Sequence, residues 1–181
     1  MGKAMQKQFV LYLVGTSGSG KTTLAYAIEK ELWKLGRKQV QVIDGDIIRG
    51  QFGDIFGYSY EERMKCNQAV RVVVQYLVDN GISVILAQVA AYRAMREKVR
   101  EQFKDEYIEI YVKCSYEECA RRDVKGYYRR QRNGEISNLN GADDRFEIPD
   151  NSSIVIDTEK ESVTDAVQRI VGYMKEHGYV V

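Results

Sequence analysis

A glycine-rich segment that carries a lysine and three threonines lies at residues 15–23. It fits the phosphate-binding pattern G-x-x-x-x-G-K-[ST] and consists of Gly15, Thr16, Ser17, Gly18, Ser19, Gly20, Lys21, Thr22 and Thr23. Glycines allow backbone N–H groups to point inward at phosphate oxygens. Lys21 adds a positive charge beside the β- and γ-phosphates, and the Thr22 hydroxyl can bind Mg²⁺. The segment therefore predicts a site for Mg²⁺ and ATP, or another nucleoside triphosphate.

Two carboxylates, Asp44 and Asp46, flank a glycine after an apolar, β-branched run. One carboxylate could orient Mg²⁺ through water, and the other could accept the proton of an acceptor hydroxyl. Gln88 follows the next apolar run where a metal-binding aspartate could have stood, so a metal carboxylate must come from this pair. We expect both to be catalytic, with Asp44 beside the metal and Asp46 beside the acceptor. Which of them is the base stays open at this point.

Arginines and lysines gather in two places after these carboxylates. Arg49 follows Asp46 by about one helical turn, and Arg63 lies in the first turn of the next expected helix; either could grip an anionic acceptor. A second group lies in residues 121–132 and comprises Arg121, Arg122, Lys125, Arg129, Arg130 and Arg132. A solvated helical face is one interpretation. We favour a lid at about residues 121–147 that closes over the triphosphate, with Arg122 and Arg129 binding ATP.

Strands and helices are expected to alternate along the chain. Apolar runs predict strands at residues 9–14, 39–43, 82–87, 107–112 and 154–156. Helical spacing or capping motifs occur between them, and one of these is the capping box Ser59-x-x-Glu62 at the start of a long helix. Strands that are apolar on both faces indicate a parallel β-sheet flanked by helices, which is an α/β fold. Ligands of such sheets bind at the carboxyl ends of the strands, where the residues above are expected. We predict a single domain over residues 1–181.

Composition and net charge argue against several classes of binding partner. The chain has 181 residues and a net charge of +1, so no global basic field suggests nucleic acid as a partner. No apolar stretch is long enough to span a membrane. Three cysteines without metal-ligand spacing indicate reduced thiols in a cytoplasmic protein. The expected partner is a small-molecule nucleotide, and a homodimer stays open.

Several motifs together resemble the adenylylsulfate kinase family, over about residues 9–158. Beyond the phosphate loop, residues 44–49 resemble the family's D-G-D-N-x-R and residues 57–63 its G-F-S-x-x-D-R. Residues 122–128 resemble R-D-x-K-G-L-Y, and residues 138–149 resemble N-F-T-G…Y-E-x-P. The last two motifs are more specific than the phosphate loop.

The resemblance implies the α/β fold of phosphate-loop kinases. It also implies transfer of the ATP γ-phosphate to the ribose 3′-hydroxyl of adenylylsulfate, with Mg²⁺. It assigns Arg49 and Arg63 to the phosphate–sulfate group of the acceptor and Tyr58 to stacking on its base. It also implies acceptor contacts from a segment that contains Lys125, Gly126 and Tyr127.

Departures from the family's pattern lie on the acceptor side. Leu139 replaces a second phenylalanine that would cover the base, and an acceptor-binding asparagine is replaced by Cys66, with Asn67 as its near neighbour. One alternative is therefore a kinase of another nucleotide, such as cytidine diphosphoramidate, a capsule-modification precursor whose smaller base needs less stacking area. A nucleotide-dependent ATPase or switch is the alternative from another class. No Asn-Lys-x-Asp motif of a GTPase is present, and the near-neutral charge disfavours an RNA-end kinase.

Overall fold

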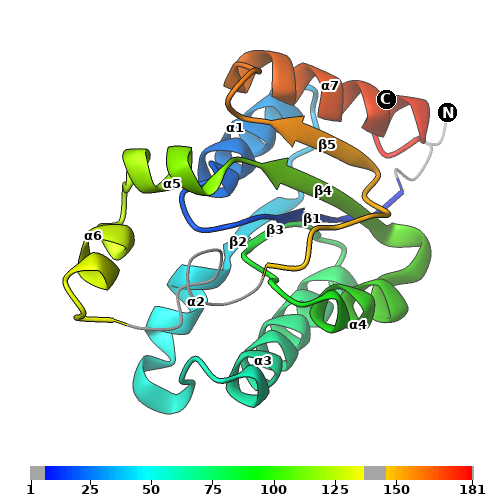
Figure 1. Cartoon of the computed structure of the whole chain (residues 1–181). Helices are drawn as coiled ribbons and strands as arrows, with labels where there is room; N and C mark the ends of the chain where they lie inside the picture. The colour runs from blue at the N-terminus through cyan, green and yellow to red at the C-terminus, as the bar shows by residue number, and fades with distance from the viewer. Residues whose placement is uncertain (1–6, 137–145, 181) are drawn as a thin grey trace, which may run out of the picture.

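A five-stranded parallel sheet forms the centre of the computed structural model, which describes residues 7–136 and 146–180 (Figure 1). The strand order is β2-β3-β1-β4-β5. The strands are β1 (Val10–Val14), β2 (Val40–Asp44), β3 (Ser83–Gln88), β4 (Tyr107–Lys113) and β5 (Ile154–Asp157). The predicted α/β fold with a parallel sheet is confirmed.

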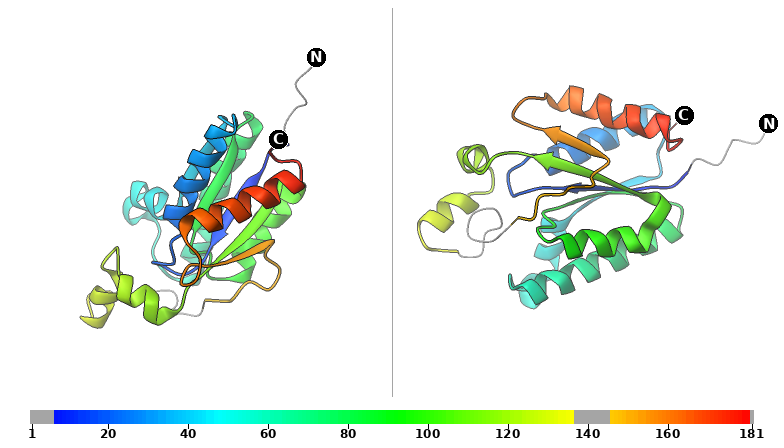
Figure 2. Two further views of the ribbon diagram at one scale, coloured as in Figure 1. Left: turned by 90° about the horizontal axis from the view of Figure 1, so that it is seen from above. Right: turned by 45° about the vertical axis from the view of Figure 1, so that its right-hand side comes forward.

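Helices cover both faces of this sheet (Figures 1 and 2). One face carries α1 (Lys21–Lys34) and α7 (Val163–Glu176), and the other carries α3 (Tyr60–Asp79) and α4 (Arg93–Phe103). Three short helices lie beyond the carboxyl ends of the strands: α2 (Gly45–Gln51), α5 (Tyr116–Arg122) and α6 (Tyr127–Arg132). Two 3₁₀ turns, η1 and η2, occupy Gly53–Ile55 and Lys104–Glu106.

The central strand β1 shows why the sheet is buried on both sides. Successive side chains of a strand point to opposite faces. Leu11 and Leu13 accordingly belong to the core under α1 and α7, whereas Val10, Tyr12 and Val14 belong to the core under α3 and α4. All five side chains are fully buried. A continuous apolar run is therefore required here, which is how the strand could be identified from sequence.

Local side-chain bonds set several helix ends. The predicted capping box is confirmed, since Ser59 accepts from the Glu62 backbone and the Glu62 carboxylate accepts from the Ser59 backbone. The basic segment at residues 121–132 is not one helical face. Asp123 adopts a left-handed conformation that ends α5, and its carboxylate accepts from the backbone N–H groups of Tyr128 and Arg129 in α6. One aspartate thus ends one helix and caps the next.

The carboxyl ends of four strands bring the chemistry-bearing residues to one edge of the sheet. The phosphate loop follows β1, Asp44 and Gln88 are the last residues of β2 and β3, and Thr158 follows β5. Parallel strands place all these positions at the same edge, as expected for a ligand site in such a sheet.

Candidate active site

The phosphate loop leaves no room for side chains where it passes the sheet. A Cβ atom at Gly15 would lie 2.4 Å from the backbone oxygen of Val112 in the neighbouring strand. Glycine is therefore required at this position for steric reasons. The loop then leads into the N-terminus of α1, whose positive dipole end and unpaired N–H groups favour an anion.

Lys21 lies inside the loop at the start of α1. Its ammonium donates to the backbone oxygens of Gly15 at 2.9 Å and Thr16 at 2.7 Å. Burial lowers the pKa of Lys21 to about 8, and the carboxylate of Asp46 offsets part of that effect. The loop thus holds a desolvated cation beside the helix N-terminus.

Both oxygens of the Asp44 carboxylate accept hydrogen bonds. Its Oδ2 accepts from the Thr22 hydroxyl at 2.6 Å. Its Oδ1 accepts from the backbone of Asp46 at 2.8 Å and of Ile47 at 3.3 Å, which caps α2. The residue is buried. Asp44 therefore ties the phosphate loop to α2 and holds two oxygen ligands, its own and that of Thr22, close together.

A small cavity of about 90 Å³ lies over the phosphate loop. Among its walls are Lys21, Thr22, Asp44, Asp46 and Lys125. This donor cavity offers cationic groups for phosphate and hard oxygen ligands for a divalent ion. Mg²⁺ typically takes only one or two protein oxygens and completes its shell with water and phosphate. The oxygen donors fit Mg²⁺, and the described residues contain no cluster of three His, Cys, Asp or Glu that could form an all-protein metal cage.

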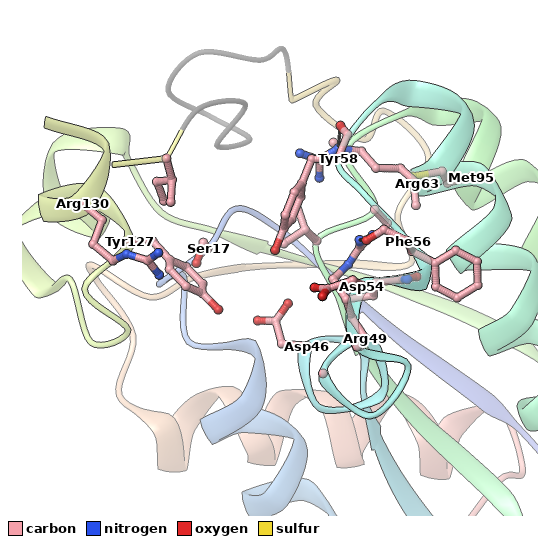
Figure 3. Close-up of a pocket in the computed structure, with 18 residues that line it drawn as sticks. Ser17, Asp46, Arg49, Asp54, Phe56, Tyr58, Arg63, Met95, Tyr127 and Arg130 are labelled. Atoms are coloured by element: carbon pink, nitrogen blue, oxygen red, sulfur yellow. Dashed lines mark hydrogen bonds between the residues drawn. The ribbon is translucent and has the colours of Figure 1, made fainter. Parts of the chain in front are cut away.

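A larger cavity of about 490 Å³ adjoins the first one (Figure 3). It brings together five residues predicted from sequence to bind the acceptor, namely Asp46, Arg49, Tyr58, Arg63 and Tyr127. Ser17, Asp46, Gln88 and Val89 line both cavities. A ligand in this acceptor cavity would therefore meet the end of a triphosphate held by the loop.

Two arginines surround Tyr58 on one wall of the acceptor cavity. The guanidinium carbons of Arg49 and Arg63 lie 4.9 and 5.3 Å from the centre of the Tyr58 ring. Arg49 also donates to the backbone oxygens of Phe56 at 3.0 Å and Gly57 at 2.7 Å, and Arg63 donates to that of Tyr58 at 2.8 Å. The wall presents two cations and one aromatic ring, which suits an anionic, ring-bearing ligand.

Asp46 stands between the two cavities and forms an ion pair with Lys125. Burial acts to lower the pKa of Lys125, but its hydrogen bond to Asp46 and the nearby negative charge raise it overall. Unlike Asp44, Asp46 keeps its carboxylate near the surface of the cavities. The hydroxyl groups of Tyr58 and Tyr127 point from opposite walls toward the side of the cavity where Asp46 lies (Figure 3).

Other residues predicted from sequence lie farther from the cavities. Asn67 is fully buried on α3 and reaches the cavities only through Gln88, to which it donates at 3.1 Å. Arg122 donates to the Thr158 side chain at 3.1 Å, and Thr158 donates to the Ser19 backbone of the phosphate loop at 3.0 Å. The backbone of Arg129 is bound to Asp123. Leu139 lies outside the described residues.

Sequence reasoning missed some residues that hold the site. The buried Tyr128 donates its hydroxyl to the Ser17 backbone at 2.7 Å and so ties α6 to the phosphate loop. Thr158 links the end of β5 to the same loop. The signal for Thr158 was its place after the last strand of a parallel sheet. The signal for Tyr128 was its match to the final tyrosine of the R-D-x-K-G-L-Y motif, to which no role had been assigned.

Comparisons with known proteins agree with this geometry. The family described as "Adenylylsulphate kinase" matches residues 7–157. The adenylyl-sulfate kinase of Staphylococcus epidermidis is 40% identical over 175 residues, with 96% of this chain and 87% of the relative covered. That of Oceanobacillus iheyensis is 41% identical over the same length and coverage. The resemblance inferred from the motifs is confirmed.

A solved structure extends the similarity to the whole fold. The Mycobacterium tuberculosis APS kinase CysC, in complex with AMPPNP and APS, has a TM-score of 0.86 and 25% sequence identity, with 94% of this chain and 99% of that chain covered. Within the described residues, none of the helices has the length and apolarity that a membrane span needs.

Proposed function

Because the chain belongs to the adenylylsulfate kinase family, we propose that it transfers the γ-phosphate of ATP to the 3′-hydroxyl of adenylylsulfate. Members of this family are phosphotransferases with a hydroxyl acceptor. The observation that carries the proposal is the pair of adjoining cavities, one over a phosphate loop and one lined by arginines and tyrosines. Asp46 belongs to both. In-line transfer needs donor and acceptor to meet at such a point.

The donor cavity accounts for ATP and Mg²⁺. Lys21 and the N-terminus of α1 would bind the phosphates, and Thr22 together with Asp44 would hold Mg²⁺, with residues 15–20 and 23 completing the loop. The ion, when bound, neutralises charge on the phosphates. Arg122 and Arg129 remain proposed ATP ligands, and Arg122 stands close to the loop through Thr158.

Asp46 is the base that we propose for the acceptor hydroxyl. Both carboxylate oxygens of Asp44 already accept hydrogen bonds from the protein, so Asp44 suits a positioning role beside the metal. The carboxylate of Asp46 borders both cavities and is bound to Lys125, which can also reach a nucleotide. A carboxylate at this junction can take the hydroxyl proton as the new bond to phosphorus forms.

The acceptor cavity supplies groups for each part of adenylylsulfate. Arg49 and Arg63 donate to backbone oxygens in this structure. With the acceptor bound, they would donate instead to its phosphate–sulfate group, because hydrogen bonds to an anion are stronger. Tyr58 and Tyr127 lie on opposite sides of the cavity and offer aromatic surface to the base (Figure 3). Lys125 and the backbone of Gly126 would contact the acceptor nucleotide nearby. Asn67 would act only through Gln88.

The whole chain is proposed to act as one kinase domain in which a segment at about residues 121–147 covers the triphosphate. Its described part is joined to the phosphate loop by the hydrogen bond from Tyr128 to Ser17. A cytoplasmic location, where ATP is abundant, and self-association as a homodimer also stay proposals.

Mass spectrometry of the reaction product tests the proposed function. The protein is incubated with Mg-ATP and either adenylylsulfate or a cytidine diphosphate derivative. We expect adenylylsulfate to gain one phosphate, and fragmentation to place it on the 3′-oxygen. Phosphorylation of the cytidine compound alone would assign a different acceptor, and ATP hydrolysis without a phosphorylated product would refute the kinase.

A further inference from the structure

Gln88 occupies the junction of the donor and acceptor cavities at the carboxyl end of β3. A phosphoryl group that moves from one cavity to the other must pass this junction. The side chain is also closely packed, because a Cβ atom at Gly45 would lie 2.9 Å from the Gln88 Cγ. Glycine at position 45 therefore allows α2 to press against the stem of Gln88.

Two buried donors orient the amide group of Gln88. Its Oε1 accepts from the Tyr12 hydroxyl at 2.7 Å and from the Asn67 Nδ2 at 3.1 Å. Tyr12 and Asn67 are both fully buried. Burial raises the pKa of Tyr12, so its hydroxyl keeps the proton that it donates. Because the amide oxygen of Gln88 faces Tyr12 and Asn67, the N–H₂ group of the same amide points away from these two residues.

The hydrogen-bond donors of the Gln88 side chain are the two N–H groups of its amide nitrogen. Within residues 7–136 and 146–180, the hydrogen bonds of the Gln88 side chain are the two that its oxygen accepts. In the same cluster, the buried Oδ1 of Asn67 has no hydrogen-bond partner among the described residues. An unsatisfied buried polar atom is destabilising, so packing alone does not account for an asparagine on this apolar face of α3.

We propose that the Gln88 side-chain N–H₂ donates a hydrogen bond to the phosphoryl group during its transfer, with Tyr12 and Asn67 as positioning residues. The inference rests on the proposed kinase function. A neutral donor held in place before reaction stabilises charge that develops on the phosphoryl oxygens without reorganisation. A carboxylate at this position would repel the same oxygens.

Substitution of Gln88 tests the proposal. In Gln88→Met, the stem keeps its shape and the donor is lost, so kcat should fall by about 10²–10³-fold. The KM values for ATP and for the acceptor should change by less than about threefold, because binding before transfer is unaffected. Gln88→Glu should be equally slow at neutral pH and should recover as the pH falls, because the protonated acid can donate. A kcat of Gln88→Met within threefold of wild type would overturn the proposal.

A double-mutant cycle tests the positioning role of Tyr12. Tyr12→Phe removes only the hydroxyl that holds the Gln88 oxygen, and kcat should fall by about tenfold with little change in KM. Adding it to Gln88→Met should cause no further loss, because the group that Tyr12 positions is already gone. Independent, multiplicative losses would show that Tyr12 affects kcat without acting through Gln88 and would contradict the proposed arrangement. Thermal unfolding midpoints of all variants serve as the folding control.

A binding measurement separates this inference from the identity of the acceptor. ADP with aluminium fluoride mimics the phosphoryl group in transfer and needs no acceptor. We expect Gln88→Met to bind this mixture at least tenfold more weakly than wild type while binding ADP alone equally well. Equal affinity for the mixture would overturn the role of Gln88, whereas a failure of wild type to phosphorylate adenylylsulfate would refute only the proposed function.

Discussion

The donor and acceptor cavities differ in how the chain builds them. Nearly half of the residues that line the donor cavity come from one continuous segment, residues 15–23, and the others come from the ends of β2 and β3 and from the turn that contains Lys125. The acceptor cavity collects side chains from α2, from the loop before α3, from α3 itself and from α6. The acceptor cavity therefore depends more on how distant segments pack together, whereas the donor cavity depends more on the local backbone of the phosphate loop.

The two sites also differ in how their charges are held. Lys21 is buried against carbonyl oxygens. Arg49 rests against the ring of the exposed Tyr58 and the backbone of the loop that follows α2. Substitutions on each side should consequently have separable effects on ATP and on the acceptor.

The largest effect is expected at Asp46, which belongs to both cavities. Asp46→Asn should lower kcat by about 10²–10⁴-fold, because the hydroxyl proton loses its acceptor. The KM for ATP should change little, as steady-state kinetics can measure. Asp44→Asn is the matched comparison and should instead raise the Mg²⁺ concentration needed for half-maximal activity. A kcat of Asp46→Asn close to that of the wild type would show that Asp46 is not the base.

Lys21 should affect the donor side alone. Lys21→Met keeps the buried stem and removes the charge, and kcat/KM for ATP should fall by about 10²–10³-fold. Binding of the acceptor, followed by calorimetry without ATP, should stay unchanged. Lys34 is an exposed lysine at the other end of α1, and Lys34→Met is the control, which should leave kcat/KM for ATP unchanged. Equal losses in both variants would contradict the assignment.

Arg49 should show the opposite pattern. Arg49→Met should raise the KM for adenylylsulfate by about 10–100-fold, the effect of losing charge-assisted hydrogen bonds. The KM for ATP should not change, which distinguishes this variant from Lys21→Met. Arg121→Met removes an exposed arginine that pairs with Glu118 outside both cavities, and it should behave as wild type. An unchanged acceptor KM in Arg49→Met would place the anion elsewhere.

The smallest effect is a pH dependence confined to the donor side. The lowered pKa of Lys21, about 8, means that its ammonium is charged at pH 7 and largely neutral at pH 9. The triphosphate prefers the charged form, so ATP affinity should weaken by about tenfold as the pH rises across this interval. Titration calorimetry can follow this change. In Lys21→Met the same interval should produce no comparable loss; if it does, another group titrates.

The contrast between the two sites also determines what sequence could predict. The phosphate loop was identified in full because its function depends on consecutive residues with fixed geometry, and Gly15 shows why the residue type is constrained. The sheet was predictable because strands such as β1 are buried on both faces. The cap at Ser59 followed from a local pattern whose two hydrogen bonds involve neighbouring residues.

The acceptor side could be only partly predicted because its contacts join distant parts of the chain. Tyr127 faces the cavity with Tyr58, and this juxtaposition depends on how α6 packs on the phosphate loop through Tyr128. The end of α5 depends on a left-handed Asp123, which no periodicity indicates. The orientation of Gln88 depends on Tyr12 and Asn67, residues 76 and 21 positions away.

The rate of ADP release with and without the acceptor tests the central claim most directly. The wild-type protein is given saturating Mg-ATP, and the initial rate is measured before and after addition of adenylylsulfate. If the two cavities act as one transfer site, adenylylsulfate should raise the rate by at least about 10²-fold, because a positioned hydroxyl replaces slow hydrolysis. A rate that is the same with and without adenylylsulfate would contradict the account.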